Sequence, residues 1–242
     1  MAFVVISHQD PNQTSLLPEI LQKYTEMPVV QVVEGGVDAR QNTVYIKPSD
    51  SDLAVLQGTL TLLRPVRSGV NTTIDIFFRH LAEDQDGKAV GIVLSGMGSD
   101  GTLGIRALKE HMGMAMAQEP STAKFGSMPQ SAIATELIDH IAPPEDLPQS
   151  LIDYIRTRSL LWQGRTIQTQ TPAPEDSLAK IFALIRYRTS QDFSGYKRST
   201  VTRRIERRMG LHQLTQMDDY IRYLQEEPAR GRDPGQGDGS SG

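Results

Sequence analysis

One stretch of the chain, Ala89–Lys109, constrains the fold more than any other; it reads AVGIVLSGMGSDGTLGIRALK. Its apolar run, Ala89–Leu94, is too short for a helix, which predicts a strand buried on both faces of a parallel sheet. The glycine-rich turn at residues 95–99 then leads into a helical pattern that begins near Leu103. Asp100 therefore lies at the carboxyl end of a central strand, where open α/β sheets place their chemistry.

Short apolar strands alternate with amphipathic helices through the first two thirds of the chain. Connections between them are short, which predicts an α/β fold with a doubly wound, Rossmann-like parallel sheet. Residues 44–63 read as a β-rich insert, in which Gln57 and Gly58 form a hairpin turn. The other expected strands are residues 2–6, 29–33, 113–118 and 138–141.

A change in composition divides the chain into two domains. We expect an α/β domain over residues 1–157 and a linker over 158–175, which contains the polar, proline-containing sequence TIQTQTPAP. Residues 176–228 predict a small all-α domain of three short helices. Residues 229–242 have no apolar periodicity, which predicts a disordered tail.

Composition narrows the class of protein. The net charge of −4 argues against nucleic-acid binding, and the absence of cysteine excludes disulfides and thiolate chemistry. No apolar run reaches the ~18 residues of a membrane span. A strand-like AFVVI follows Met1 without a basic region, so we expect no signal peptide and a cytoplasmic location. The five histidines lack ligand-like spacing, so no metal site is predicted.

The glycine turn allows a dinucleotide-binding interpretation. Gly96, Gly98 and Gly101 match the G-x-G-x-x-G pattern between a strand and a helix. Asp100 argues against this alternative, because its carboxylate would face the negative pyrophosphate at the helix N-terminus.

A hydrolase interpretation assigns Asp100 to hold a histidine that acts as general base. His8 is the best candidate because it ends another predicted parallel strand. Structural alternatives stay open, since His8 can be a hydrogen-bonded structural residue and Asp100, like Thr102, can cap the following helix. The chain contains no Gly-x-Ser-x-Gly, so it shows no nucleophile elbow.

Several segments resemble the catalytic domain of CheB-type chemotaxis protein-glutamate methylesterases over roughly residues 2–155. They include FVVISHQDP, IDIFFRHLAED, VGIVLSGMGSDGTLGIRALKE and QEPSTAKFGSMPQSAIAT. After the linker, IRYRTSQDFSGYKRSTVTRRIERRM and DDYIRYL resemble the helical N-terminal domain of CheR-type receptor methyltransferases. The chain thus resembles part of a methylesterase–methyltransferase fusion.

The resemblance implies hydrolysis of glutamyl methyl esters on chemoreceptors by a Ser-His-Asp triad without a cofactor. It places the triad histidine at His8, the aspartate at Asp100 and an oxyanion-binding backbone N–H at Met97. We expect Asp100 to hold His8 through its Nδ1–H. The family's serine follows an earlier strand, upstream of residues 2–6, so we expect the chain by itself to be inactive or weak. The methyltransferase's S-adenosylmethionine-binding domain has no counterpart in the sequence.

Basic residues crowd one segment of the second domain. Residues 176–228 hold ten Lys and Arg against seven Asp and Glu. On a helix, four arginines occupy an arc opposite an apolar stripe, namely Arg203, Arg204, Arg207 and Arg208. A solvated helix face is the plain interpretation, and nucleic-acid binding fits poorly with an acidic protein. The resemblance instead implies docking to the acidic methylation helices of chemoreceptors, without membrane insertion.

Overall fold

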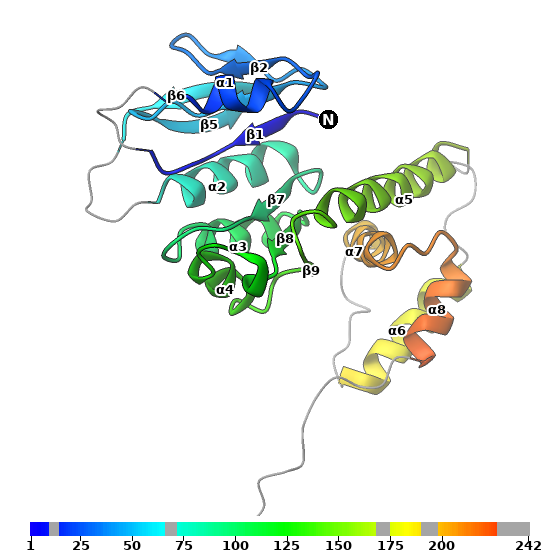
Figure 1. The fold of residues 1–242 in the computed structure, drawn as a ribbon. Coiled ribbons are helices and arrows are strands. Elements are labelled where there is room, and N and C mark those ends of the chain that lie inside the picture. The colour runs from blue at the N-terminus through cyan, green and yellow to red at the C-terminus, as the bar shows by residue number, and fades with distance from the viewer. Residues whose placement is uncertain (10–14, 66–71, 168–174, 190–197, 227–242) are drawn as a thin grey trace, which may run out of the picture. The chain divides into compact units, whose positions relative to one another are not determined.

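The computed structural model describes the chain except for residues 10–14, 66–71, 168–174, 190–197 and 227–242 (Figure 1). The chain divides into two compact units, Met1–Ser150 and Leu151–Gly242. The first contains every described strand, and the second consists of helices. The predicted disordered tail lies outside the described residues.

The first parallel sheet of unit 1 has the order β1-β4-β2. Its strands are β1 (Phe3–Val5), β4 (Val44–Ile46) and β2 (Val29–Gln31), and α1 (Leu17–Gln22) connects β1 to β2. The assignment of residues 44–46 to a β-rich insert was wrong, because β4 is the central strand, pairing with a parallel neighbour on each side. Three residues carry too little pattern to distinguish a central strand from an insert.

An antiparallel sheet of order β3-β6-β5 follows. Its strands are β3 (Val37–Asp38), β5 (Asp52–Leu56) and β6 (Thr59–Leu63). The predicted hairpin is confirmed, since Leu56 pairs with Thr59 across the turn. Gln57 and Gly58 both have positive φ, 51° and 78°, as the two-residue turns that match strand twist require.

The second parallel sheet has the order β7-β8-β9. Its strands are β7 (Val90–Val93), β8 (Met114–Gln118) and β9 (His140–Ala142). Two α-helices and a 3₁₀ turn lie in its connections, namely α3 (Thr102–Glu110), α4 (Ser127–Ile133) and η1 (Pro120–Thr122). The predicted α/β class with flanking helices is confirmed. Its parallel strands form two sheets instead of one, because no described strand joins β1 to β7.

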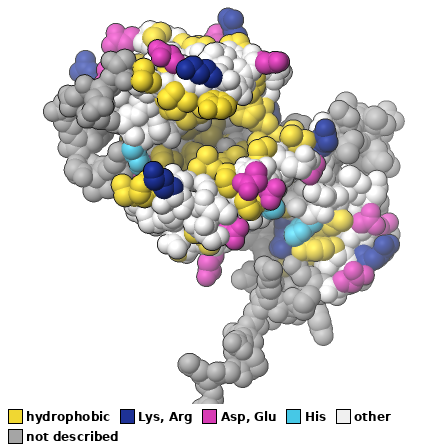
Figure 2. Space-filling view, viewed as in Figure 1, with side chains coloured by type: hydrophobic (Ala, Val, Ile, Leu, Met, Phe, Trp, Pro, Cys, Tyr) yellow, Lys and Arg dark blue, Asp and Glu magenta, His cyan; other side chains and the backbone are white. Residues whose placement is uncertain are grey.

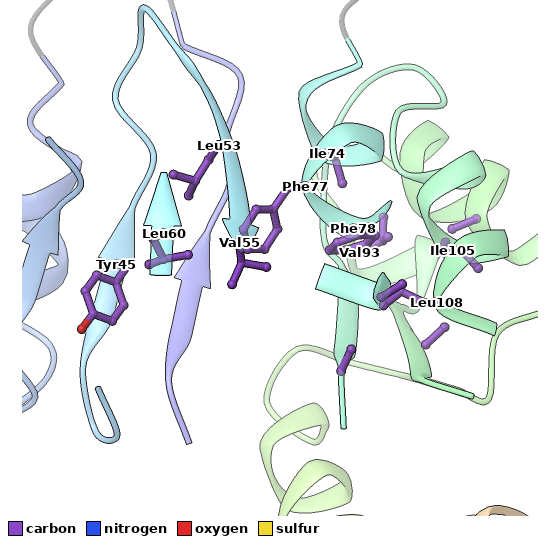
Figure 3. Close-up of a cluster of buried hydrophobic side chains, with 14 of the residues drawn as sticks. Tyr45, Leu53, Val55, Leu60, Ile74, Phe77, Phe78, Val93, Ile105 and Leu108 are labelled. Carbon is purple, nitrogen blue, oxygen red and sulfur yellow. The ribbon is translucent and has the colours of Figure 1, made fainter. Parts of the chain in front are cut away.

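Helix α2 (Thr73–Gln85) connects the two halves of unit 1 through one hydrophobic core. Figure 3 shows Phe77 pointing toward Val55 of β5, while Phe78 lies toward Val93 and Leu108. The core therefore contains side chains from both parallel sheets and from the antiparallel one. This packing brings residues that follow β1 and β7 into one region.

Unit 2 contains the three predicted helices, α6 (Glu175–Thr189), α7 (Arg198–Leu211) and α8 (Met217–Glu226). Their predicted apolar stripes form its core, which consists of Leu178, Ile181, Val201, Ile205, Met209, Tyr220, Ile221 and Leu224. Helix α5 (Leu147–Ile167) continues past residue 158, so the first part of the predicted 158–175 linker is helical. Among the described helices, none combines the length and apolar character needed to cross a membrane.

Candidate active site

His8 and Asp100, 92 residues apart in sequence, meet in unit 1. The His8 Nε2 lies 2.8 Å from the Asp100 Oδ2. The Asp100 side chain is 4% exposed and that of His8 is 31% exposed, so a buried carboxylate holds an accessible imidazole. His8 follows β1 and Asp100 follows β7, so the pair joins the carboxyl ends of edge strands from the two parallel sheets.

Asp100 also accepts hydrogen bonds from three backbone N–H groups. Those of Asp75 and Gly101 donate to its Oδ1 at 3.0 and 2.9 Å, and that of Ile74 donates to its Oδ2 at 3.0 Å. Two of these donors belong to the first turn of α2, where the helix dipole stabilises a negative charge. All four neighbours of the carboxylate thus present hydrogen-bond donors to it.

The structure therefore corrects the expected cap of α3. Asp100 caps α2 instead, because the turn after β7 lies against the N-terminus of that helix. Thr102, the other predicted cap, donates its hydroxyl to the Ser99 carbonyl at 3.0 Å. A sequence pattern identifies a capping residue type but does not reveal which helix end lies within its reach.

Asp75 is the residue of this region that sequence analysis missed. Its Oδ1 accepts the N–H of Gly104, in the first turn of α3, at 2.7 Å. Burial raises the pKa of Asp75, and the charge of Asp100 raises it further, while the N–H donors of α3 act in the opposite direction. An acidic residue in the first turn of α2, between the buried Ile74 and Phe77, was the available signal.

Gly104 allows the two helices to approach this closely. A Cβ at this position would lie 2.5 Å from the Phe78 Cβ and 3.2 Å from the Asp75 Cα. Any larger residue must push α3 away from α2, and the turn that carries Asp100 lies immediately before α3. The helix contact and the position of the carboxylate are therefore coupled.

The expectation that Nδ1 of His8 faces Asp100 was wrong, because the structure presents Nε2. The sequence does not distinguish the two ring nitrogens, because which one reaches the carboxylate depends on the tertiary arrangement of His8 and Asp100. With Nε2–H donated to Asp100, the lone pair of the neutral ring lies on Nδ1. Nδ1 is thus the nitrogen left to accept a proton.

The turn that contains Met97 is held on both sides. The Gly96 N–H donates to the Phe125 carbonyl at 2.9 Å, and the Gly98 N–H donates to the Ser127 Oγ at 3.1 Å. The Met97 N–H has no hydrogen-bond partner within the described part of the chain, and the residue is 69% exposed. This N–H is therefore available to an oxyanion, although its role stays a prediction.

The glycines of this turn have structural explanations that do not involve a dinucleotide. A Cβ at Gly96 would lie 2.5 Å from the Met128 Cε, and Gly98 and Gly101 have φ of 91° and 97°. Near the start of α3, Asp75 already accepts the Gly104 N–H. Two carboxylates at the helix ends repel a pyrophosphate, so the structure does not favour this alternative.

A histidine–serine contact also occurs in unit 1, between the His140 Nε2 and the Ser150 Oγ at 2.7 Å. Ser150 lies in α5, and its hydroxyl also donates to the Asp146 carbonyl at 3.2 Å. The Ser150 hydroxyl can donate to the His140 Nε2 or to the Asp146 carbonyl, and Ser150 lies within a helix and not on a nucleophile elbow. This pair reads as a structural contact.

In unit 2, helix α7 presents the predicted apolar stripe to the core, with Val201, Ile205 and Met209 buried. Arg204 and Arg208 are exposed, and Arg207 is partly buried. The side chain of Arg203 lies outside the described residues. The exposed arginines therefore lie apart from the helical core, as the periodicity predicted.

Two family models match this chain. The one described as CheB methylesterase covers residues 1–151, and the one described as CheR methyltransferase, all-alpha domain, covers residues 176–231. His8, Met97 and Asp100 all fall within the first match. The four arginines fall within the second.

Among individual proteins, the Rhodobacter capsulatus "Uncharacterized 104.1 kDa protein in hypE 3'region" is 34% identical over 228 residues, which cover 86% of this chain and 24% of that protein. The "Protein-glutamate methylesterase/protein-glutamine glutaminase 2" of Burkholderia lata is 32% identical over 160 residues, covering 66% of this chain and 47% of the relative. The chain thus spans less than half the length of these relatives.

Among solved structures, the Thermotoga maritima CheB methylesterase catalytic domain superposes with a TM-score of 0.57 at 27% identity. The superposition covers 62% of this chain and 82% of that domain. It agrees with the first family match in extent and in fold class. This chain therefore belongs to the CheB methylesterase family, and it continues into a segment of the CheR all-alpha type.

Proposed function

We propose that this chain contributes the base and the oxyanion donor for hydrolysis of glutamyl methyl esters on chemoreceptors. The 2.8 Å contact between the His8 Nε2 and the Asp100 Oδ2 carries the proposal. A buried carboxylate that accepts a histidine N–H fixes the tautomer and stabilises the imidazolium that forms during acyl transfer. The Met97 N–H is the proposed donor to the tetrahedral oxyanion.

The nucleophile comes from outside the 242 residues, in this proposal, because none of their serines lies in a Gly-x-Ser-x-Gly elbow. The two parallel sheets end on edge strands β1 and β7, and the residues after those strands form the His8–Asp100 pair. Figure 2 shows hydrophobic side chains lining a hollow between the part that holds β1 and the part that holds β7. A further parallel strand in this position would end beside His8 and present a serine there.

The chemistry follows from this placement. The serine Oγ attacks the ester carbonyl while the His8 Nδ1 accepts its proton, and the developing oxyanion accepts the Met97 N–H. The carbonyl re-forms, methoxide leaves, and His8 returns the proton to release methanol. Water then attacks the acyl-enzyme by the same route and frees the glutamate and the serine. Several relatives are also named as glutaminases, and amide hydrolysis attacks the same carbonyl position.

We further propose that unit 2 brings the esterase unit to its substrate. Chemoreceptor methylation regions are the proposed partners, in a cytoplasmic setting. The exposed Arg204 and Arg208 on α7 support docking to an acidic helix, because exposed cations attract such a surface without burying charge. The matches to both chemotaxis families agree with this division of roles.

The test restores the nucleophile. A strand–Gly-x-Ser–helix segment from a full-length relative is fused ahead of Met1, and methanol release from methylated receptor is measured. We expect activity from the fused protein and essentially none when its serine is replaced by alanine. A fused protein that binds receptor but releases no methanol would overturn the catalytic proposal and favour a non-catalytic docking module. Equal methanol release by the unmodified chain would place the nucleophile within the 242 residues.

A further inference from the structure

Asp75 is a buried acid beside the proposed catalytic pair that touches neither His8 nor any proposed substrate position. We propose that it is a positioning residue, which holds the turn carrying Asp100 against α2 and thereby fixes the ring nitrogen of His8 that carries the proton. This inference rests on the proposed function of the His8–Asp100 pair, which it deepens.

Two hydrogen bonds that run in opposite directions carry the argument. The Asp75 N–H donates to the Asp100 Oδ1 at 3.0 Å, and the Asp75 Oδ1 accepts the Gly104 N–H at 2.7 Å. Residues 101–103 lie between the two contact points on the second segment. Asp75 therefore holds both ends of the segment from Asp100 to Gly104. In this way α2 and α3 cap each other.

This double contact determines how the Asp100 carboxylate is oriented. Its Oδ1 accepts two backbone N–H groups, from Asp75 and Gly101, while its Oδ2 accepts only Ile74 from the backbone. Oδ2 is thus the oxygen presented to His8. If the turn moves away from α2, this orientation is lost and either ring nitrogen can face the carboxylate.

Burying Asp75 beside a second carboxylate is unfavourable in free energy, which favours a role for Asp75 in holding the site. Two carboxylates lie close together with little solvent, and the pKa of Asp75 is raised accordingly. The N–H donors of two helix ends are what make this proximity tolerable. A neutral cap would stabilise α3 without the repulsion, although it would hold the turn less tightly.

A merely structural role is the alternative, and the same unit offers a matched control. The Asp139 side chain is 7% exposed, accepts the Ala115 N–H at 2.9 Å and pairs with Lys109. Neither Ala115 nor Lys109 lies in the turn that carries Asp100. Its replacement removes a comparable carboxylate–backbone bond without touching the turn that carries Asp100.

The test uses the full chain with ¹⁵N-labelled histidine and reads the tautomer of His8 from its ring ¹⁵N signals at alkaline pH. We expect the Nε2–H form to predominate in the unmodified protein. Asp75→Ala should lower the ratio of this form to the Nδ1–H form by about fivefold or more, the effect of losing one ordinary hydrogen bond. Asp75→Asn, whose amide oxygen still accepts the Gly104 N–H, should restore the ratio, and Asp139→Ala should leave it unchanged.

An unchanged ratio in folded Asp75→Ala, or an equal change in Asp139→Ala, would overturn the positioning role. If Asp75→Ala does not fold, Asp75→Ser provides the same comparison, because its side chain is one bond shorter and does not span to Gly104. A predominance of the Nδ1–H form in the unmodified protein would instead contradict the His8–Asp100 pairing. The two proposals therefore fail in different measurements.

Discussion

The acid at Asp100 and the arginines of α7 are both charged, yet the structure places them in opposite environments. Asp100 is enclosed in unit 1, where three backbone N–H groups and His8 donate to it. Arg204 and Arg208 are exposed on the side of α7 away from the core of unit 2. One region concentrates its interactions on a single buried group, and the other distributes charge over a surface.

This difference predicts how each region responds to change. In a buried site of low dielectric constant, water does not replace a lost hydrogen-bond partner of a charged group. Removing one partner therefore leaves the remaining groups with unsatisfied hydrogen bonds. Exposed charges are hydrated and screened, and each contributes about 0.2–1 kcal/mol to an interaction. We therefore expect large and specific effects in the first region and small, salt-dependent effects in the second.

The largest expected effect is that of Asp100→Asn in the protein with a restored serine segment. The asparagine amide places donors against backbone donors and holds the wrong tautomer of His8, a change that costs about 10⁴ in kcat in a serine protease triad. We expect a loss of this order in methanol release, with KM nearly unchanged. Asp139→Asn is the matched control. A loss of less than about tenfold would make Asp100 a helix cap only.

Two helical glycines give the next effect, with opposite signs in the two units. Gly104→Ala creates a 2.5 Å approach to the Phe78 Cβ, so we expect unit 1 to lose about 1–3 kcal/mol of unfolding free energy. In α7, a Cβ at Gly210 meets only the Tyr154 ring at 3.5 Å or more. Gly210→Ala should therefore stabilise unit 2 by up to about 1 kcal/mol through helix propensity. Denaturant unfolding measures the change in unfolding free energy of each variant. A change of the same sign in both variants would contradict this explanation by packing.

A smaller effect depends on pH. Because the folded-state pKa of Asp75 is raised, the folded protein binds more protons than the unfolded chain above the ordinary value of 3.8. The contribution of Asp75 is thus most favourable below that value and is lost as pH rises through the folded pKa. We expect Asp75→Asn to gain stability relative to the unmodified protein over this window. Denaturation midpoints of both proteins, measured from pH 4 to 7, provide the test. A difference in midpoint that stays constant over this range would contradict the expectation.

The smallest expected effect concerns Arg204 and Arg208. Their joint replacement by serine should weaken binding to receptor methylation-region helices only a few-fold, mostly through slower association, and less at high salt. The double variant Lys180→Ser with Arg222→Ser removes the same charge from exposed positions on α6 and α8 and serves as the control. Titrations at low and high ionic strength provide the measurement. If neither salt nor the α7 substitutions change the binding affinity, these arginines form only a solvated helix face.

Local pattern was sufficient where an element depends mainly on its own residues. The apolar run before the glycine turn predicted the strand β7, although β7 lies at the edge of its described sheet and not at the centre, where its apolar run had placed it. The Gln57–Gly58 pair predicted the hairpin. The apolar periodicity predicted α7 and its buried face. His8 and Asp100 were predictable as a pair because parallel strands place their carboxyl ends at one edge of a fold.

The sequence by itself thus determined the elements, the α/β class and the residues of the His8–Asp100 pair, because these follow from periodicity, turn chemistry and short motifs. Only the tertiary structure decided that β4 is a central strand, that Asp100 caps α2, that Nε2 of His8 faces the carboxylate, and that Asp75 caps α3. These features depend on which helix ends and strand edges lie within about 3 Å of one another. Such distances arise from packing between segments far apart in the chain, and no local pattern encodes them.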